Sequence, residues 1–341
     1  IADGANLYAG SSNGFYFSVD SGSPWTQSNN GMSSSYSVND LLFIGNTLFA
    51  GTDGGGVYSS ADSGATWTAS NNGLTALTVY CLLVNGSDFF AGTDSGVFYS
   101  NNTGANWTSA SSGITGTLVR SLAVSGSTVF AGVSLNGIFQ TTDNGSSWSV
   151  TGSGIPTGYY FNDIIVHGSD VFAAIFGYGV YKTNNLGTSW TAANNGITDL
   201  TARCFLSYGS TLYTGVENVG VYTSTNNGVS WALSSDGMKS DYVRSLLFNG
   251  TELVASSNIN GLFVSGNAGN SWVASNNGFS VNNQQGVFAF GTMLFCGTNY
   301  SNAYRSLDNG LSWTPSGTGI TNPNVFTFTS RANHLFAGTL G

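Results

Sequence analysis

Arginine side chains recur at one position of this sequence, each at the start of a short apolar segment. Arg120, Arg203 and Arg244 are three of the five arginines in the chain. Guanidinium groups donate paired, charge-assisted hydrogen bonds, so such a set suits a carboxylate, a sulfated group or another polar ligand. In other segments of the same kind the position holds Asn39, Tyr80, Asn162 and Gln285. We take this row as a candidate ligand-binding site, with a solvated polar rim as the alternative.

Aromatic side chains close to this row offer flat surfaces on which sugar rings could stack. We include Tyr178 and Tyr300 in the candidate site. Binding pockets commonly combine aromatic walls with a few polar groups, which the row would supply. The remaining aromatic neighbours, for which packing is the simpler explanation, are Tyr159, Tyr160, Phe176 and Tyr242. The combination suggests a glycan or a protein partner as ligand.

Carboxylates in the same regions raise the alternative of a glycoside hydrolase. Such enzymes need two carboxyl groups about 5–10 Å apart. The candidates are Asp53, Asp94, Asp163 and Glu217, and no spacing in the sequence pairs any two of them. We therefore assign no catalytic residue and treat hydrolysis as the second hypothesis.

Cysteine and histidine give no sign of a metal or redox site. The three cysteines, Cys81, Cys204 and Cys296, lack a CxxC spacing and have no nearby histidine pair, which predicts free thiols. The two histidines, His167 and His334, fall in turns away from the arginine row. We expect neither a metal nor a cofactor.

Charge and hydropathy exclude two classes of partner. Seven basic residues stand against sixteen acidic ones, for a formal net charge of −9. Binding to a nucleic-acid backbone needs clustered lysine and arginine, so nucleic acid is excluded. No apolar stretch reaches the length of a membrane-spanning helix, and we expect no membrane insertion.

A repeat of about 41 residues organises the whole chain. Every tryptophan belongs to it, with a glycine three residues before and another six residues after. The period equals that of a four-stranded propeller blade. The eight tryptophans are Trp25, Trp67, Trp107, Trp148, Trp190, Trp231, Trp272 and Trp313.

Each repeat predicts four short β-strands and no helix. Around Trp67 these are residues 38–44, 47–52, 56–60 and 67–70, rich in β-branched and aromatic residues and bounded by Gly, Asn or Asp. Short links such as Gly45-Asn46 are typical of antiparallel hairpins. The expected unit is an antiparallel meander.

The segment Ser60-Ala-Asp62-Ser-Gly64-Ala-Thr66-Trp67 resembles the Asp-box, or BNR, repeat. Similar boxes occur in sialidases, xyloglucan-degrading hydrolases, sortilin-type receptors and a photosystem II assembly factor. The resemblance covers the whole chain and implies a β-propeller, but it does not fix a function. The low charge and the richness in Asn, Thr and Ser resemble the composition of secreted bacterial Asp-box proteins. A sialidase activity is not supported, because no FRIP-like segment and no Tyr–Glu pair can be identified.

The box itself has a structural explanation. It should form the turn between the last two strands, where Gly64 allows a positive φ and Asp62 accepts backbone N–H groups. An alternation of Asp and Asn keeps the acceptor and loses the charge, which argues against calcium. The eight acceptors are Asp20, Asp62, Asn102, Asp143, Asn185, Asn226, Asn267 and Asp308.

The two ends of the chain predict how the ring closes. Leu335-Phe-Ala-Gly-Thr339 repeats Leu7-Tyr-Ala-Gly-Ser11 eight periods later. We expect an all-β, closed, eight-bladed propeller whose composite blade joins N-terminal strands to residues 325–329; seven or nine blades are the alternatives. Residues 1–341 should form one propeller domain. The redundant strand copy is consistent with a segment of a longer protein.

In such a propeller, ligands should bind at the mouth of the central channel, opposite the boxes, where the loops diverge between repeats. Our leading hypothesis is a noncatalytic extracellular binding or structural module of bacterial type. The alternative is a glycoside hydrolase of sialidase-like or xyloglucanase-like type. Nothing in the sequence indicates the oligomeric state.

Overall fold

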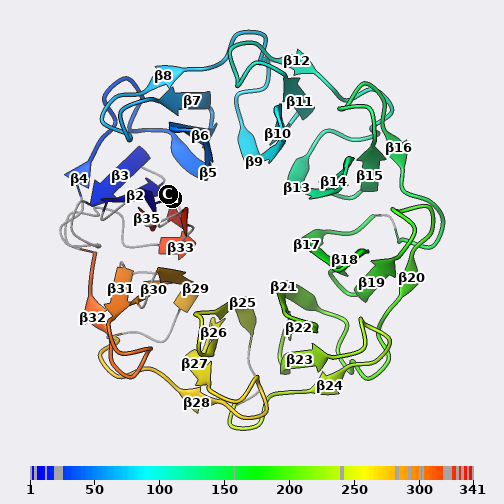
Figure 1. The fold of residues 1–341 in the computed structure, drawn as a ribbon, viewed down its shortest axis with the longest axis vertical. Helices are drawn as coiled ribbons and strands as arrows, with labels where there is room; N and C mark the ends of the chain where they lie inside the picture. Colours follow the sequence, from blue (N-terminus) through cyan, green and yellow to red (C-terminus); the bar gives the residue numbers. More distant parts are fainter. Residues whose placement is uncertain are drawn as a thin grey trace.

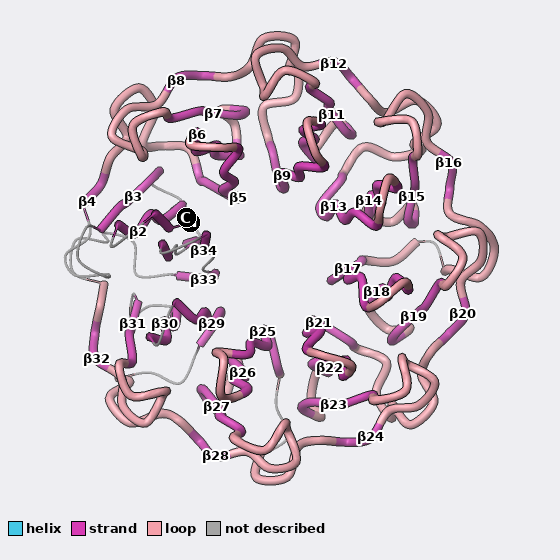
Figure 2. The backbone as a smooth tube through the Cα atoms, in the orientation of Figure 1, coloured by secondary structure: helices cyan, strands magenta, loops and turns pink. Residues whose placement is uncertain are grey.

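The computed structural model is a ring of β-sheets arranged around a common centre (Figure 1). It describes residues 2–3, 6–11, 14–18, 26–156, 158–238, 242–280, 284–290, 293–298, 301, 303–317, 325–327, 330–331, 334–335 and 338–339. All regular structure among these residues is β-strand, as Figure 2 shows. The predicted all-β, eight-bladed propeller is confirmed.

Seven blades are antiparallel sheets of four consecutive strands, numbered here from blade 1 (β5–β8) to blade 7 (β29–β32). The inner strands are β5 (Ser37–Ile44), β9 (Val79–Asn85), β13 (Val119–Ser125), β17 (Phe161–His167), β21 (Ala202–Tyr208), β25 (Val243–Phe248) and β29 (Gln284–Phe290). The second strands are β6 (Thr47–Asp53), β10 (Asp88–Thr93), β14 (Thr128–Val133), β18 (Asp170–Ile175), β22 (Thr211–Val216), β26 (Leu253–Ser257) and β30 (Met293–Thr298).

The outer half of each blade is equally regular. The third strands are β7 (Gly56–Ser60), β11 (Gly96–Ser100), β15 (Gly137–Thr141), β19 (Gly179–Thr183), β23 (Gly220–Ser224), β27 (Gly261–Ser265) and β31 (Ala303–Ser306). The outer strands are only two residues long: β8 (Thr68–Ala69), β12 (Thr108–Ser109), β16 (Ser149–Val150), β20 (Thr191–Ala192), β24 (Ala232–Leu233), β28 (Val273–Ala274) and β32 (Thr314–Pro315).

The eighth blade is built from both ends of the chain. Strands β1 (Ala2–Asp3), β2 (Asn6–Ser11), β3 (Gly14–Ser18) and β4 (Thr26–Gln27) join β34 (Ser330–Arg331) and β35 (His334–Leu335) in one six-stranded sheet. This composite blade lies between blades 7 and 1 and closes the ring (Figure 1).

One detail of the closure differs from our expectation. Strand β33 (Val325–Thr327) pairs with β36 (Gly338–Thr339), not with the N-terminal strands. The pair Val325 and Thr339 has the same separation in sequence as Val243 and Ser257 in blade 6. Because Leu335–Thr339 repeats Leu7–Ser11, the inner strand has a second-strand copy of its own close by, and it takes that local partner.

The core is a series of apolar layers between neighbouring blades. A typical layer contains Phe49 and Val57 of blade 1 with Phe89, Phe98 and Trp107 of blade 2. Second strands are buried along nearly their whole length because both faces of each sheet meet another blade. The second strands of these blades carry no charged side chain between their ends, so a site is sought at the strand ends, in the loops and along the inner strands.

Candidate functional site

The ends of the strands divide the ring into two faces. In an antiparallel meander, the turn between the first two strands and the turn between the last two lie at one end of the blade. The other end carries the middle loop and the connection to the next blade. We call the end with Asp62 the box face, and the end with the loop 54–55 the loop face.

On the box face, the side chain of the box acceptor organises the turn. Asp62 Oδ1 accepts hydrogen bonds from Ser60 Oγ and from the Thr66 backbone N–H, both at 2.8 Å. Ser60 Oγ in turn accepts the Gly64 N–H at 2.7 Å. The other described acceptors make corresponding bonds, among them Asn102, Asp143, Asn185, Asn226, Asn267 and Asp308.

The electrostatics of the acidic boxes follow from these bonds. Hydrogen bonds from Ser147 and Thr141 lower the pKa of Asp143 to about 2. Bonds from Ser306 and Ser312 do the same for Asp308. Since each carboxylate is already satisfied within its own turn, the turn needs no added ion. Among the described residues, no cluster of His, Cys, Asp or Glu could hold a metal.

The box tryptophans connect each blade to the one before it. Trp107 is 2% exposed, and its indole Nε1–H donates to Ser70 O of blade 1 at 2.7 Å. Its backbone carbonyl contacts Gly73, where a Cβ would lie only 2.1 Å from the oxygen. Only glycine therefore fits at this position, and the other described glycines that lie six residues after a tryptophan approach a tryptophan carbonyl as closely. The described tryptophans are Trp67, Trp107, Trp148, Trp190, Trp231, Trp272 and Trp313, all buried; Trp25 and Asp20 lie outside the described residues.

On the loop face, Arg203 and Arg244 come together around one tyrosine. The Cζ atoms of both arginines lie 4.7 Å from the ring centroid of Tyr242. The Arg203 guanidinium is also 4.9 Å from the ring of Phe176. Its Nε and Nη2 donate to Glu217 Oε2 at 3.1 and 2.6 Å. These five residues, from blades 4, 5 and 6, form what we call the arginine–aromatic cluster.

The third arginine of the row lies elsewhere. Arg120, in blade 3, is exposed and stacks on Tyr80 of blade 2, with its Cζ 4.7 Å from the ring centroid. Blade 4 separates it from Arg203. The shared repeat position thus brings two arginines to one aromatic ring and leaves the third with a partner of its own.

Two asparagines of the row bridge neighbouring inner strands. Asn39 Nδ2 donates to Val79 O at 2.9 Å, and Asn162 Nδ2 donates to Ala202 O at 2.7 Å. Both are thereby occupied with contacts between blades 1 and 2 and between blades 4 and 5. Gln285 lies in β29 and is described only by its backbone, and Tyr300 lies outside the described residues.

The residue after each of these asparagines is a half-buried acid whose carboxylate reaches the same neighbouring strand. Asp40 Oδ2 accepts the Leu82 N–H at 2.7 Å, and Asp163 Oδ2 accepts the Phe205 N–H at 2.8 Å. Desolvation raises the pKa of both carboxyl groups to about 6. The sequence analysis missed Asp40, although its Asn-Asp pair repeats at Asn162-Asp163.

The cysteines are free thiols in the structure. Burial raises the pKa of Cys204 to about 12, with the nearby Asp163 adding to the effect. The pKa of Cys81 rises for the same reasons, with Asp40 as the neighbouring acid. Both thiols stay protonated and behave as small apolar side chains.

The aromatic neighbours of the cluster lie in the loops of blade 4. Tyr178 donates its hydroxyl to the hydroxyl of Tyr159 at 2.8 Å, with the two ring centroids 4.3 Å apart. Tyr160 is 55% exposed and Phe176 is 39% exposed. Blade 4 therefore presents aromatic rings to solvent beside Arg203, which stacks on Phe176.

The four candidate carboxylates each have a separate local partner. Asp53 accepts from Thr78 Oγ1 at 2.9 Å and Asp94 from Ser95 Oγ at 3.1 Å. Asp163 is occupied by the Phe205 N–H, and Glu217 by Arg203. His167 is buried on the box side, with Nδ1 2.6 Å from Ser207 Oγ.

Searches of protein families and of curated proteins find no match to this chain. Solved structures do match, at low sequence identity. The computationally designed Ika8 protein superposes with a TM-score of 0.65 at 13% identity, over 89% of this chain and 93% of that one. The extracellular domain of a proposed one component system from B. thetaiotaomicron gives 0.60 at 18%, over 82% and 39%.

A third similar structure is the GH74 xyloglucanase from Xanthomonas campestris, with a TM-score of 0.51 at 14% identity, over 88% of this chain and 56% of that one. The chain thus spans well under two thirds of the length of the two natural proteins. At these identities the likeness concerns the fold alone. The class of protein is the β-propeller, and its function has to be argued from the site. The described residues contain no helix able to cross a membrane.

Proposed function

We propose that this chain is a noncatalytic binding module that takes a carbohydrate on its loop face, over blades 4 to 6. The observation that carries the proposal is the arginine–aromatic cluster, in which Arg203 and Arg244 share the ring of Tyr242. Side chains held by mutual stacking lose little further entropy when a ligand binds, which favours recognition by a preformed surface.

The balance of charge in the cluster favours a neutral or weakly acidic sugar. Glu217 neutralises Arg203 through a 2.6 Å ion pair, so the cluster keeps only the charge of Arg244. The exposed rings of Tyr160 and Phe176 offer apolar faces with polar groups at their edges. A strongly anionic ligand would need more free guanidinium groups than the cluster provides.

The noncatalytic part of the proposal rests on the carboxylates. Each candidate acid is engaged by a different local donor, and the arrangement supplies no free pair for an acid and a base or nucleophile. The similarity to a xyloglucanase is compatible with sugar binding on this fold but gives no catalytic residues. We also propose an extracellular location, in line with the low content of charged residues and with the extracellular propeller that this chain resembles.

The test is titration calorimetry of the intact chain against neutral and acidic oligosaccharides at one salt concentration. We expect Phe176→Ala to weaken binding about tenfold or more, because an exposed stacking ring is lost. Tyr208→Ala is the matched control, since Tyr208 is an exposed aromatic of blade 5 on the box face. Arg120→Ala should also leave affinity unchanged, because Arg120 lies outside the cluster.

Two results would contradict the proposal. Equal affinity in wild type and Phe176→Ala would remove the cluster as the binding surface. New reducing ends appearing in the incubated oligosaccharides, and absent without protein, would show a hydrolase.

A further inference from the structure

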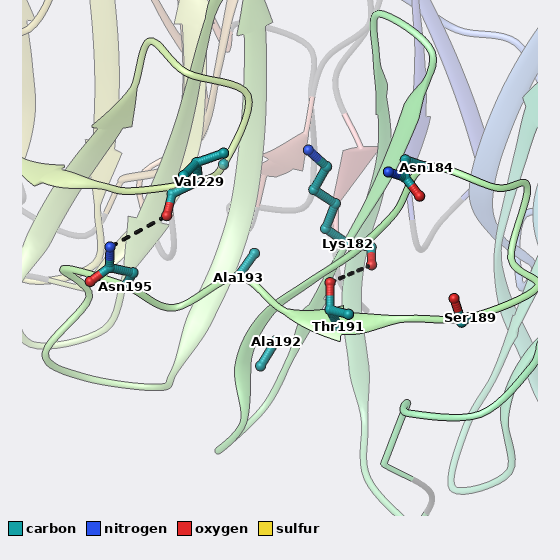
Figure 3. Close-up of a pocket in the computed structure, with 9 residues that line it drawn as sticks. Lys182, Asn184, Ser189, Thr191, Ala192, Ala193, Asn195 and Val229 are labelled. Atoms are coloured by element: carbon teal, nitrogen blue, oxygen red, sulfur yellow. Dashed lines mark hydrogen bonds between the residues drawn. The ribbon is translucent and has the colours of Figure 1, made fainter.

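A second kind of site occurs on the box face, in the grooves between neighbouring blades. Each groove lies between the outer strands of one blade and the box turn of the next. The groove between blades 4 and 5 has a volume of about 300 Å³, and the Lys182 side chain extends into it (Figure 3). The corresponding groove between blades 6 and 7 has a volume of about 250 Å³.

Lys182 shows which chemistry such a groove accommodates. Its Nζ forms a 2.7 Å ion pair with Asp170, at the start of the second strand of the same blade. It also donates to Asn227 O in the box turn of blade 5, at 2.7 Å. The ammonium group lies 5.5 Å from the centroid of the Phe172 ring. An acid, a box carbonyl and an apolar wall together hold one alkylammonium group.

Blade 6 has the acid of this arrangement without the lysine. Glu252 occupies the position of Asp170, and Val264 occupies the position of Lys182. Glu252 Oε2 is buried and has no hydrogen-bond partner among the described residues. In blade 2, the corresponding acid Asp88 accepts from Tyr99 Oη at 2.6 Å. Of these three acids, Glu252 is thus the one that lacks an internal donor.

The remaining walls suit the stem of a long cationic side chain. Val273 and Leu311, which line the groove, are 71% and 77% exposed. Asn309 corresponds to Asn227 and shares its positive φ, 56° against 58°, so an equivalent turn borders both grooves. Gly266, which also lines the groove, lies beside the carboxylate: a Cβ built on it would be 3.7 Å from Glu252 Oε1.

We infer that the groove between blades 6 and 7 binds a lysine side chain of a partner polypeptide. The ammonium group pairs with Glu252, and the aliphatic stem lies against Val273 and Leu311. A buried carboxylate oxygen without a donor is costly, and an incoming ammonium group removes that cost. The site is on the opposite face from the arginine–aromatic cluster and does not depend on it.

The experiment is NMR titration of the isotope-labelled chain with a pentapeptide whose central residue is lysine. The same peptide with norleucine in place of lysine tests whether the charge is needed. The free amine n-butylamine tests whether the ammonium group must belong to a polypeptide. We expect saturable shifts around Glu252 with the lysine peptide, and affinity at least tenfold weaker for the norleucine peptide and for n-butylamine.

Variants locate the site. Glu252→Gln should weaken the affinity for the lysine peptide at least tenfold. Val264→Lys should abolish binding, because it places an internal lysine next to Glu252, as Lys182 lies next to Asp170 in blade 4. Asp88→Asn is the matched control at the same strand position and should bind the peptide normally. Unchanged affinity in Glu252→Gln would overturn the inference even if Val264→Lys fails to fold. Equal affinity for n-butylamine would show a free amine, not a polypeptide, as the ligand.

Discussion

The pH dependence of stability provides the sharpest test of how the inner strands hold together. Burial raises the pKa of Asp40 and Asp163 from 3.8 to about 6 in the folded chain. Between pH 4 and 6 the folded state therefore binds more protons than the unfolded chain. Stability from these two groups is fully present below pH 4 and is lost as the pH rises through 6.

The expected change in the free energy of unfolding follows from the size of the pKa shift. Moving one carboxyl pKa from 3.8 to about 6 corresponds to about 3 kcal/mol at full burial. Both side chains are half-buried, so water screens part of this, and we expect about 1–2 kcal/mol from each residue. The box carboxylates Asp143 and Asp308 have pKa values of about 2, so the stability that they contribute is lost as the pH falls below 4, outside the range of the assay.

The assay is urea denaturation at half-unit steps from pH 4 to 8, compared between wild type and the double variant Asp40→Asn, Asp163→Asn. The variant loses acceptors, since Asp40 accepts the Leu41 and Leu82 N–H groups on its two oxygens, so its absolute stability falls. The measured quantity is the slope of the free energy of unfolding against pH, and this slope should be flatter in the double variant than in the wild type.

The exposed Asp94→Asn is the control and should keep the wild-type slope. An identical slope in wild type and double variant would refute the claim that these two carboxyl groups are desolvated.

Three other predictions concern the boxes and the contacts between blades. Asp62→Ala should lower the free energy of unfolding in urea by about 1 kcal/mol, because the Thr66 donors lose their acceptor and bind water instead. Calcium should leave the melting temperature of the wild type unchanged, and a calcium-dependent shift would mean that the boxes hold ions. Trp107→Ala should cost about 3–5 kcal/mol through loss of a buried indole, and a smaller loss would place the ring outside the core. Gly73→Ala should destabilise far more than Gly86→Ala, which has a positive φ but no atom within 4 Å; equal effects would show that the Trp107 carbonyl contact is unimportant.

Contacts that repeat at fixed spacing could be predicted from the sequence. A blade contacts chiefly its two neighbours, and the tryptophan, the box and the two glycines of each repeat serve the same nearest-neighbour interface every time. The spacing of six residues in the sequence between Trp67 and Gly73 is fixed, because Gly73 must contact the Trp107 carbonyl of the next blade. Such contacts impose a period on the chain, and the period gave the fold and the blade number.

The closing blade shows where periodicity stops being sufficient. The sequence identifies two copies of one strand, Leu7–Ser11 and Leu335–Thr339, but it gives both the same pairing pattern. Only the structure assigns β36 to β33 and places β35 against β1. Chain connectivity decides between the two equivalent strands, because β33 and β36 are close in the sequence.

The candidate site depends still more on the tertiary structure. Arg120, Arg203 and Arg244 are equivalent in the sequence, yet only the last two meet at Tyr242. Glu217 neutralises Arg203, whereas blade 6 has Val264 where blade 4 has Lys182, and the buried oxygen of Glu252 has no donor among the described residues. A repeat fixes where each backbone position lies, but the partner of a charged side chain depends on what the neighbouring, non-identical loops place within about 4 Å of it. The sequence by itself therefore determined the frame, and the folded chain decided which charges on that frame remain free to bind.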